Sequence, residues 1–380
     1  MTTMTANVRP VTFEDYIAQE DAKATLQLLI DDIELSIQGS PNTDATSLQG
    51  PSVLIVGSPG TGKTTLARIY ANILSQKARA GNWPHYEFGE QGSEDEWSGD
   101  GLPNLLYRFA VVEARDLASH RLTEETCELY GRTLKGLSSP DKAKMVLDAY
   151  VHWVDIQGTL FIDEVQDLQP KLQEALLPLM EDGLWTNDLL GGERSVHSGF
   201  SLIAATTDES KLTPALMSRF TSIIKLEPYD EGDLEEIVRT TANRMGLSLS
   251  EDAVDVMVDR GRNNPRQIRQ NLKMLEKVAR VARHDIANAD DAIQAARHNG
   301  IGMFGLTNDD SRVLRFLLEH GKVGARTLTD ALGFNTEANY KTWERFLLER
   351  QYVIPGGGGR MLTTKGRDIL ELMDQSKRGL

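Results

Sequence analysis

The chain has 380 residues, of which 26% are charged and 40% hydrophobic, enough for two or three domains that each bury a core. The formal net charge of −15 argues against a protein whose whole surface is coated in nucleic acid. No run of 18 apolar residues occurs and Cys127 is the single cysteine, so neither a membrane span nor an internal disulfide is expected. Residues 1–5 lack the basic and apolar regions of a secretory signal, which favours a cytoplasmic location.

The first element that carries chemistry is a predicted strand at 53–56, followed by a glycine-rich turn and a predicted helix over 66–74. The turn matches the pattern G-x-x-x-x-G-K-[ST] without substitution. Backbone N–H groups of such a turn close around a phosphate, Lys63 can reach the β- and γ-phosphates, and the Thr64 hydroxyl can ligate Mg²⁺. A chance glycine-rich turn is the alternative, but the order of strand, loop and helix favours binding of ATP. The predicted binding residues are Gly57, Ser58, Pro59, Gly60, Thr61, Gly62, Lys63, Thr64 and Thr65.

The next stretch, about 80–124, breaks the alternation of predicted strands and helices. Residues 81–101 are rich in turn-forming and acidic residues and are predicted to form a surface insertion. Helices are predicted at 102–119 and 141–153.

A second motif follows at the end of the apolar run 159–162, which is predicted to be another buried strand. Asp163 is placed to hold the Mg²⁺ shell, and Glu164 to polarise the attacking water as a general base. A solvated acidic pair at the start of a helix is the alternative. Together with the phosphate loop, the pair favours hydrolysis of the nucleotide over binding alone.

The remaining pattern predicts a β-hairpin at 183–200, a buried strand at 201–207 and helices from 230 to 298. The fold class is therefore α/β, with a mostly parallel sheet in the first part of the chain. We expect three domains: 1–228 for nucleotide binding, a small helical domain over 229–304, and a third domain over 305–380.

The third domain combines helices at 309–319, 326–332 and 337–349 with a hairpin formed by 352–354 and 361–363, which is typical of a winged helix. It carries 12 Lys and Arg against 10 Asp and Glu, whereas the rest of the chain has a balance of −17. A phosphate backbone is therefore repelled least here. The candidate DNA contacts are Asn339, Lys341, Arg345 and Arg360. The wing tip is tetraglycine without basic residues, so a protein-binding winged helix remains the alternative.

In this order, the motifs resemble those of an AAA+ ATPase, and in detail they resemble the RuvB family of Holliday-junction branch-migration motors. Further matches are Arg9-Pro10, Tyr16-Ile17-Ala18-Gln19-Glu20, Leu179-Met180-Glu181-Asp182, Ala205-Thr206-Thr207, Leu216-Met217-Ser218-Arg219-Phe220, Asn264-Pro265-Arg266 and Arg360-Met361-Leu362-Thr363-Thr364.

The resemblance implies roles for residues that the pattern alone does not assign. It places Tyr16 and Ile17 near the adenine, makes Thr206 or Thr207 the residue of sensor 1, makes Arg219 the arginine finger and assigns Arg266 to sensor 2. It implies a hexameric ring, DNA (junction or duplex) as a partner, the helical domain as a lid, and a RuvA-like or other protein docked on the hairpin 183–200.

The chain also departs from the family. Ala18 stands where the family carries Gly, Gln166-Asp167 replaces the pair that follows the family's catalytic Glu, and the hairpin is short. The sequence therefore predicts a divergent, RuvB-like DNA-translocating ATPase. The alternative is a protein-remodelling or regulatory ATPase of a mobile element, whose winged helix binds a protein.

Overall fold

The computed structural model describes residues 9–38, 50–80, 108–117, 138–154, 157–187, 192–195, 199–333 and 344–378. The chain divides into two compact units, one from Arg9 to Pro228 and the other containing Tyr229–Leu380. Two of the candidate DNA contacts, Asn339 and Lys341, lie outside the described residues, as does most of the predicted insertion at 80–124.

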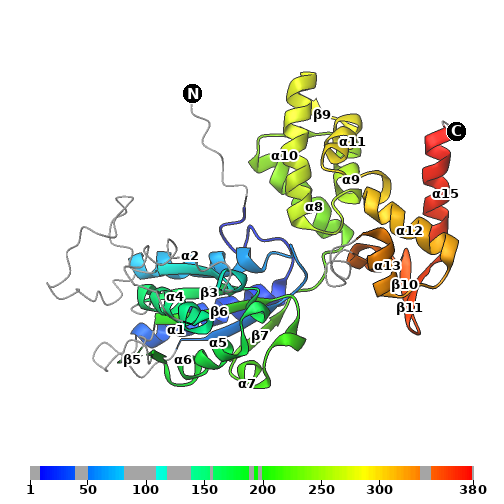
Figure 1. The fold of residues 1–380 in the computed structure, drawn as a ribbon. Helices are drawn as coiled ribbons and strands as arrows, with labels where there is room; N and C mark the ends of the chain where they lie inside the picture. The colour runs from blue at the N-terminus through cyan, green and yellow to red at the C-terminus, as the bar shows by residue number, and fades with distance from the viewer. Residues whose placement is uncertain are drawn as a thin grey trace. The chain divides into compact units, whose positions relative to one another are not determined.

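The first unit is built on a parallel sheet with the strand order β2-β3-β6-β1-β7 (Figure 1). Its strands are β1 (Ser52–Val56), β2 (Arg108–Glu113), β3 (Gln157–Asp163), β6 (Gly199–Thr206) and β7 (Ser222–Lys225). Its helices are α1 (Glu20–Gln38), α2 (Lys63–Ala80), α4 (Ser139–Val154), α5 (Pro170–Ala175), α6 (Leu177–Asp182) and α7 (Pro214–Met217). Short 3₁₀ turns are η2 (Ala114–Leu117), η3 (Val165–Asp167) and η4 (Glu209–Lys211).

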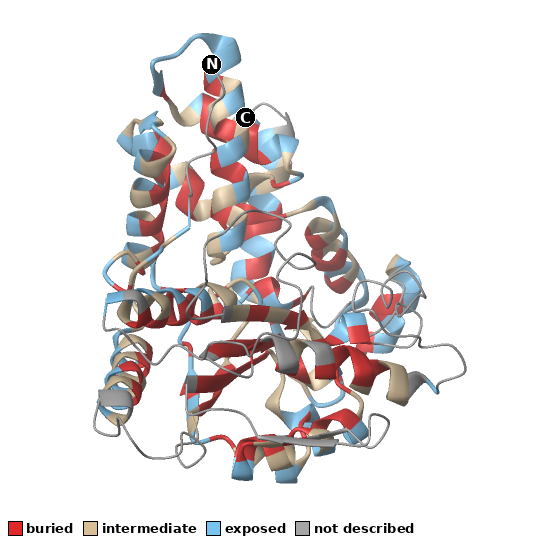
Figure 2. Ribbon diagram, turned by 90° about the vertical axis from the view of Figure 1, so that its left-hand side faces the viewer, coloured by how far each residue is buried: buried red, intermediate tan, exposed pale blue. Residues whose placement is uncertain are grey.

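Both faces of this sheet are buried, as Figure 2 shows for its central strands. In β1, Val53 and Ile55 face one apolar core together with α1 and α2, whereas Leu54 faces a second core. This alternation is the period-two geometry of a strand, and burial on both sides explains why the strands read as continuous apolar runs. The predicted α/β fold with a parallel sheet is confirmed.

The helix predicted at 102–119 is wrong over its described part, because 108–113 form strand β2 and pair in parallel with β3. A short apolar run such as Phe109–Val112 does not distinguish a buried strand from a buried helix by periodicity. The stretch expected as an insertion therefore contributes an edge strand to the sheet. The predicted helix at 141–153 corresponds to α4, and the predicted hairpin at 183–200 to β4 (Leu184–Asn187) and β5 (Gly192–Ser195).

The second unit begins with a helical part and ends with a winged helix. The helical part contains α8 (Glu231–Arg244), α9 (Glu251–Asp259), α10 (Pro265–Ala282) and α11 (Ala289–His298), with a short parallel pair, β8 (Ser248–Leu249) and β9 (Ile286–Ala287). The winged helix contains η5 (Met303–Gly305), α12 (Asn308–His320), α13 (Ala325–Leu332), helical residues 344–349, the antiparallel wing β10 (Val353–Gly356) and β11 (Gly359–Leu362), and α15 (Thr364–Arg378). The final helix, α15, was not predicted from the sequence.

Arg262 connects the two parts of this unit. Arg262, between α9 and α10, donates to the Gly305 carbonyl at 2.7 Å and to Asp310 at 2.5 Å. Its guanidinium also lies 4.0 Å from the ring centroid of Phe346. Because Asp310 is fully buried, the pair ties the helical part firmly to the winged helix. Among the described helices, none is long and apolar enough to cross a membrane.

Candidate nucleotide site

The predicted nucleotide residues gather at one edge of the sheet. The phosphate loop follows β1, Asp163 and Glu164 follow β3, and Thr206 and Thr207 end β6. Because β3, β6 and β1 are adjacent and parallel, their carboxyl ends meet at the same edge. The topology therefore brings together three segments that are separated by up to about 150 residues in the sequence.

The phosphate loop, 57–65, is closed by its own hydrogen bonds. The Lys63 ammonium is almost fully buried and donates to the carbonyls of Gly57 at 2.8 Å and Ser58 at 3.1 Å. Gly62 has a φ of +101°, and a Cβ added there would stand 2.2 Å from the Tyr16 hydroxyl. Only glycine fits this position, because it tolerates both the backbone angle and the close approach. The loop then enters α2, whose first N–H groups and dipole favour an anion.

Tyr16 is buried against this loop, and its hydroxyl donates to the Thr61 carbonyl at 2.8 Å. Ile17 beside it is half-buried. The next residue, Ala18, has a φ of 57°, in the left-handed region that favours glycine. A glycine, which the family carries at this position, would adopt this angle without strain, whereas this chain adopts it with Ala18. Contact of Tyr16 and Ile17 with an adenine stays a prediction.

The predicted metal ligands lie side by side. The Thr64 hydroxyl donates to Asp163 Oδ2 at 2.8 Å. Burial raises the pKa of the Asp163 carboxyl, and the negative charge of Glu164 acts in the same direction, whereas the Thr64 hydrogen bond lowers it. The positive charge of Lys63 also lowers this pKa. A hydroxyl and a half-buried carboxylate are a suitable donor set for Mg²⁺ delivered with a nucleotide. The residues present therefore fit this ion.

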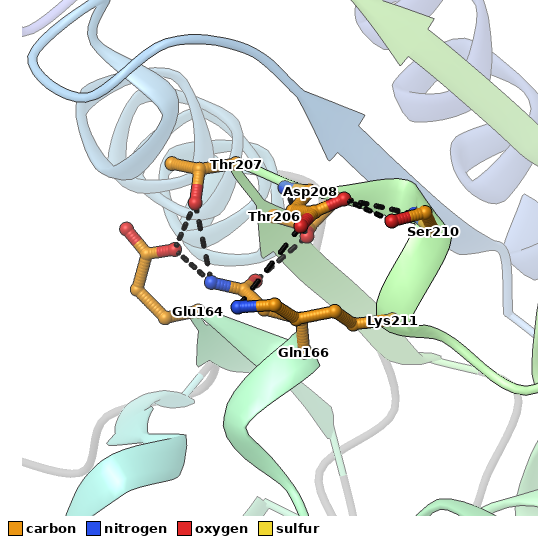
Figure 3. Close-up of polar contacts among 7 residues, drawn as sticks. All are labelled: Glu164, Gln166, Thr206, Thr207, Asp208, Ser210 and Lys211. Carbon is orange, nitrogen blue, oxygen red and sulfur yellow. Dashed lines mark hydrogen bonds and ion pairs between the residues drawn. The ribbon is translucent and has the colours of Figure 1, made fainter. Parts of the chain in front are cut away.

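The predicted base, Glu164, directly precedes the turn η3 and has φ 53° and ψ 48°, an uncommon left-handed conformation for a residue with a side chain. Its Oε2 accepts hydrogen bonds from the Thr207 hydroxyl at 3.1 Å and from the Gln166 amide at 2.6 Å (Figure 3). Thr207, one of the two sensor 1 candidates, is thus in direct contact with the predicted base.

Sequence reasoning missed Gln166 as a member of this site. Its amide also accepts from the Thr206 hydroxyl at 2.7 Å, so it connects the end of β3 to the end of β6. The available signal was the departure from the family pattern at this position. The sequence contains no information about which strand end the side chain faces.

The proposed arginine finger, Arg219, follows α7 and forms an ion pair with Glu181 at the end of α6. Both side chains are about two-fifths exposed. The guanidinium is therefore held at the surface by a carboxylate of the same chain, which sequence reasoning did not identify as its partner.

The sensor 2 candidate belongs to the other unit. Arg266 lies in the first turn of α10, and its backbone N–H is capped by the side chain of Asn264 at 2.9 Å. The Arg266 side chain is exposed. Its role in sensing the nucleotide stays a prediction.

The two described candidates for DNA contact both pair with carboxylates of their own domain. Arg360 binds the buried Glu344 through Nη2 at 2.6 Å and Nε at 2.9 Å. Arg345 pairs with Glu349 at 2.8 Å on the same helix. Neither guanidinium is therefore presented as an uncompensated charge.

Comparison with known proteins gives three family matches. Residues 53–228 match the ATPase family associated with various cellular activities (AAA). Residues 8–90 match the Holliday junction DNA helicase RuvB P-loop domain, and residues 303–371 match the RuvB C-terminal winged helix domain. Together these matches extend over both units.

Solved structures agree with this pattern. The Thermotoga maritima RuvB Holliday junction branch migration motor is 23% identical with a TM-score of 0.68, over 96% of this chain and 98% of that chain. The Aeropyrum pernix ORC2 protein is 16% identical with a TM-score of 0.53, over 97% of this chain and 98% of that chain. At these identities the likeness concerns the fold.

Proposed function

The chain is a RuvB-like AAA+ ATPase, and on that premise we propose that it forms a hexameric ring that moves junction or duplex DNA by hydrolysing ATP. The observation that carries the proposal is the convergence of the phosphate loop, Asp163 with Glu164, and Thr207 at one sheet edge, in a chain that also matches the RuvB winged helix.

The residues divide the work of hydrolysis. The loop N–H groups and Lys63 bind the phosphates of ATP, and Glu164 accepts the proton of the attacking water. Mg²⁺, held by Thr64 and Asp163, would neutralise charge on the phosphate oxygens when bound. Thr207 holds the carboxylate of Glu164 through its hydroxyl.

Assembly completes the site. An arginine finger acts on the nucleotide of a neighbouring subunit, and Arg219 must leave Glu181 to do so. The half-exposed state of the pair makes this exchange inexpensive, because surface ion pairs contribute little to stability. Arg266 would contact the nucleotide from the lid.

DNA binding is assigned to the winged helix, with Asn339, Lys341, Arg345 and Arg360 as candidate contacts. The paired state of Arg345 and Arg360 favours a second candidate function, in which this domain holds a protein and the ATPase remodels or regulates it. The hairpin β4–β5 is the proposed docking element for a RuvA-like or other partner.

The test is ATP turnover by the full chain at stated salt, without DNA and with a four-way junction, duplex or single-stranded DNA, alongside gel shifts of the same DNAs. We expect junction or duplex DNA to bind and to stimulate turnover, with affinity falling steeply as salt rises. Turnover that no DNA changes, together with absent binding at low salt, would contradict the DNA function and favour the protein-remodelling candidate.

A further inference from the structure

The amide of Gln166 is fixed at both ends. Its Nε2 lies 2.6 Å from Glu164 Oε2 and 3.2 Å from the Thr207 hydroxyl, and its Oε1 lies 2.7 Å from the Thr206 hydroxyl (Figure 3). Three polar partners around one half-buried amide make this side chain a bridge between β3 and β6, the two strands whose ends carry Glu164 and sensor 1.

The chemistry of the partners determines which way the amide points. An ionised carboxylate only accepts hydrogen bonds, so the atom that faces Glu164 must be the nitrogen. The Thr206 hydroxyl then donates to the amide oxygen, and its own oxygen accepts the backbone N–H of Asp208 at 3.0 Å. Thr206 is fully buried, so this orientation is not exchanged with water.

The chain of hydrogen bonds begins in a braced turn. Asp208 accepts from the Ser210 backbone at 3.1 Å and from the Ser210 hydroxyl at 2.6 Å. These bonds hold the pKa of Asp208 below its ordinary value, so it stays charged and keeps the turn closed. Hydrogen bonds then run from the Asp208 N–H through Thr206 and Gln166 to Glu164, and each polarises the next.

We propose that Gln166 is a positioning residue for ATP hydrolysis, which orients the Glu164 carboxylate and couples it to the end of β6. Both bonds from Gln166 and Thr207 end on Oε2, so Oε1 is the oxygen that is left to accept from the attacking water. The Glu164 side chain has three rotatable bonds, and a hydroxyl at 3.1 Å is a weaker restraint than an amide at 2.6 Å. The proposal rests on the assignment of Glu164 as the general base.

A movement of the β6 end would then reach Glu164 through Gln166. Thr206 contacts Gln166, and Gln166 contacts Glu164, whereas Thr207 contacts both. Glu164 is therefore linked to the end of β6 in two ways: directly through Thr207, and through Gln166 to Thr206. The second link uses a residue that departs from the family pattern.

The central experiment compares Gln166→Met with wild type in steady-state ATP turnover. Methionine has similar length and volume but forms no such hydrogen bonds, so we expect kcat to fall about 10- to 100-fold, the loss of a hydrogen bond to a charged group. KM and the Kd of a non-hydrolysable fluorescent ATP analogue should change less than about twofold. The thermal unfolding midpoint reports whether the variant is folded.

Matched variants separate positioning from support of the fold. Asp167→Asn alters the exposed neighbour in the same 3₁₀ turn and should leave kcat unchanged. Gln166→His keeps one donor and one acceptor and should recover part of the activity lost in Gln166→Met. Thr206→Ser keeps the hydroxyl and should retain more activity than Thr206→Val. Thr206→Val should lower kcat and add little to the loss in Gln166→Met, because both changes break the same connection.

The variants also distinguish failure of this proposal from failure of its premise. In a Glu164→Gln background, Gln166→Met should have no further effect on turnover. A folded Gln166→Met protein with kcat within twofold of wild type would overturn the proposal, as would parallel losses of kcat and of analogue affinity. If Glu164→Gln itself turned over ATP normally, the base assignment would be wrong. If Gln166→Met does not fold, the double variant Gln166→His with Thr206→Val replaces it. Losses of kcat that add up independently in this double variant would overturn the coupling of Glu164 to the end of β6 through Gln166.

Discussion

The nucleotide edge of the first unit and the winged helix of the second present their polar side chains in opposite ways. At the nucleotide edge, Asp163 accepts a hydrogen bond from Thr64 and Glu164 accepts one from Thr207, and the half-buried Asp163 forms no ion pair within 4 Å among those given for the described residues. In the winged helix, Arg345 and Arg360 are already matched by Glu349 and Glu344.

The difference distinguishes a site whose charged groups can bind a ligand from a surface whose charged groups are paired with one another. Charged groups that await a ligand are held at some cost in stability, whereas Arg345 and Arg360 already have a carboxylate partner each. The nucleotide edge is therefore the part of the first unit that is arranged to receive a charged ligand.

The largest expected effect tests whether the nucleotide site of one chain needs an arginine from a neighbouring chain to hydrolyse ATP. Arg219→Ala should lower kcat by on the order of 10³-fold or more, because an arginine finger stabilises charge on the transferred phosphoryl group. Mixing the Arg219→Ala chain with a Lys63→Ala chain should restore part of the activity. At some boundaries an intact Lys63 of one chain then meets an intact Arg219 of its neighbour. Glu181→Gln, which releases Arg219, is the control and should keep turnover. Full activity of a monomer at concentrations without oligomers would contradict this prediction.

The next effect tests the base at the nucleotide edge. Glu164→Gln should cut kcat by about 10²- to 10⁴-fold, because the amide cannot accept the water proton. ATP affinity, measured with a fluorescent analogue, should be retained, whereas Lys63→Ala should lose affinity. Near-normal turnover by Glu164→Gln would remove Glu164 from the mechanism.

Arg360 tests the other side of the comparison. Arg360→Ala should destabilise the winged helix by about 3 kcal/mol, because it leaves the buried Glu344 carboxylate without its partner. Chemical denaturation measures this loss of unfolding free energy. The control is the double variant Glu344→Gln with Arg360→Met, which removes both charges. If Arg360 also contacts DNA, the doubly substituted protein should bind with a salt slope lower by about one. An unchanged slope assigns Arg360 to stability alone.

The smallest effect concerns the stability cost of partly burying the Asp163 carboxylate. Because burial raises the pKa of Asp163, the folded state holds this proton more tightly than the unfolded state, and the group lowers stability as pH rises through that range. In the absence of nucleotide, Asp163→Asn should therefore have a higher unfolding midpoint than wild type at pH 7. The gain should disappear at low pH, where the carboxyl is protonated in both states. A midpoint below that of wild type at pH 7 would contradict this reading.

The nucleotide site could be predicted in part because its signals are local. The loop 57–65 is contiguous, its glycines are dictated by backbone angles and close approach, and Asp163 with Glu164 directly ends an apolar strand. The prediction failed at 108–113, because an apolar run of this length is compatible with either a helix or a strand until its neighbours are known.

By itself, then, the sequence determined the α/β class, the phosphate loop and the acidic pair, because each is encoded by adjacent residues. Only the tertiary structure decided the pairings: Gln166 with Thr206, Arg219 with Glu181, and Arg360 with Glu344. Composition gives the charges that a domain contains but not which of them are neutralised. That depends on which strand ends and helix faces the fold brings within hydrogen-bonding distance.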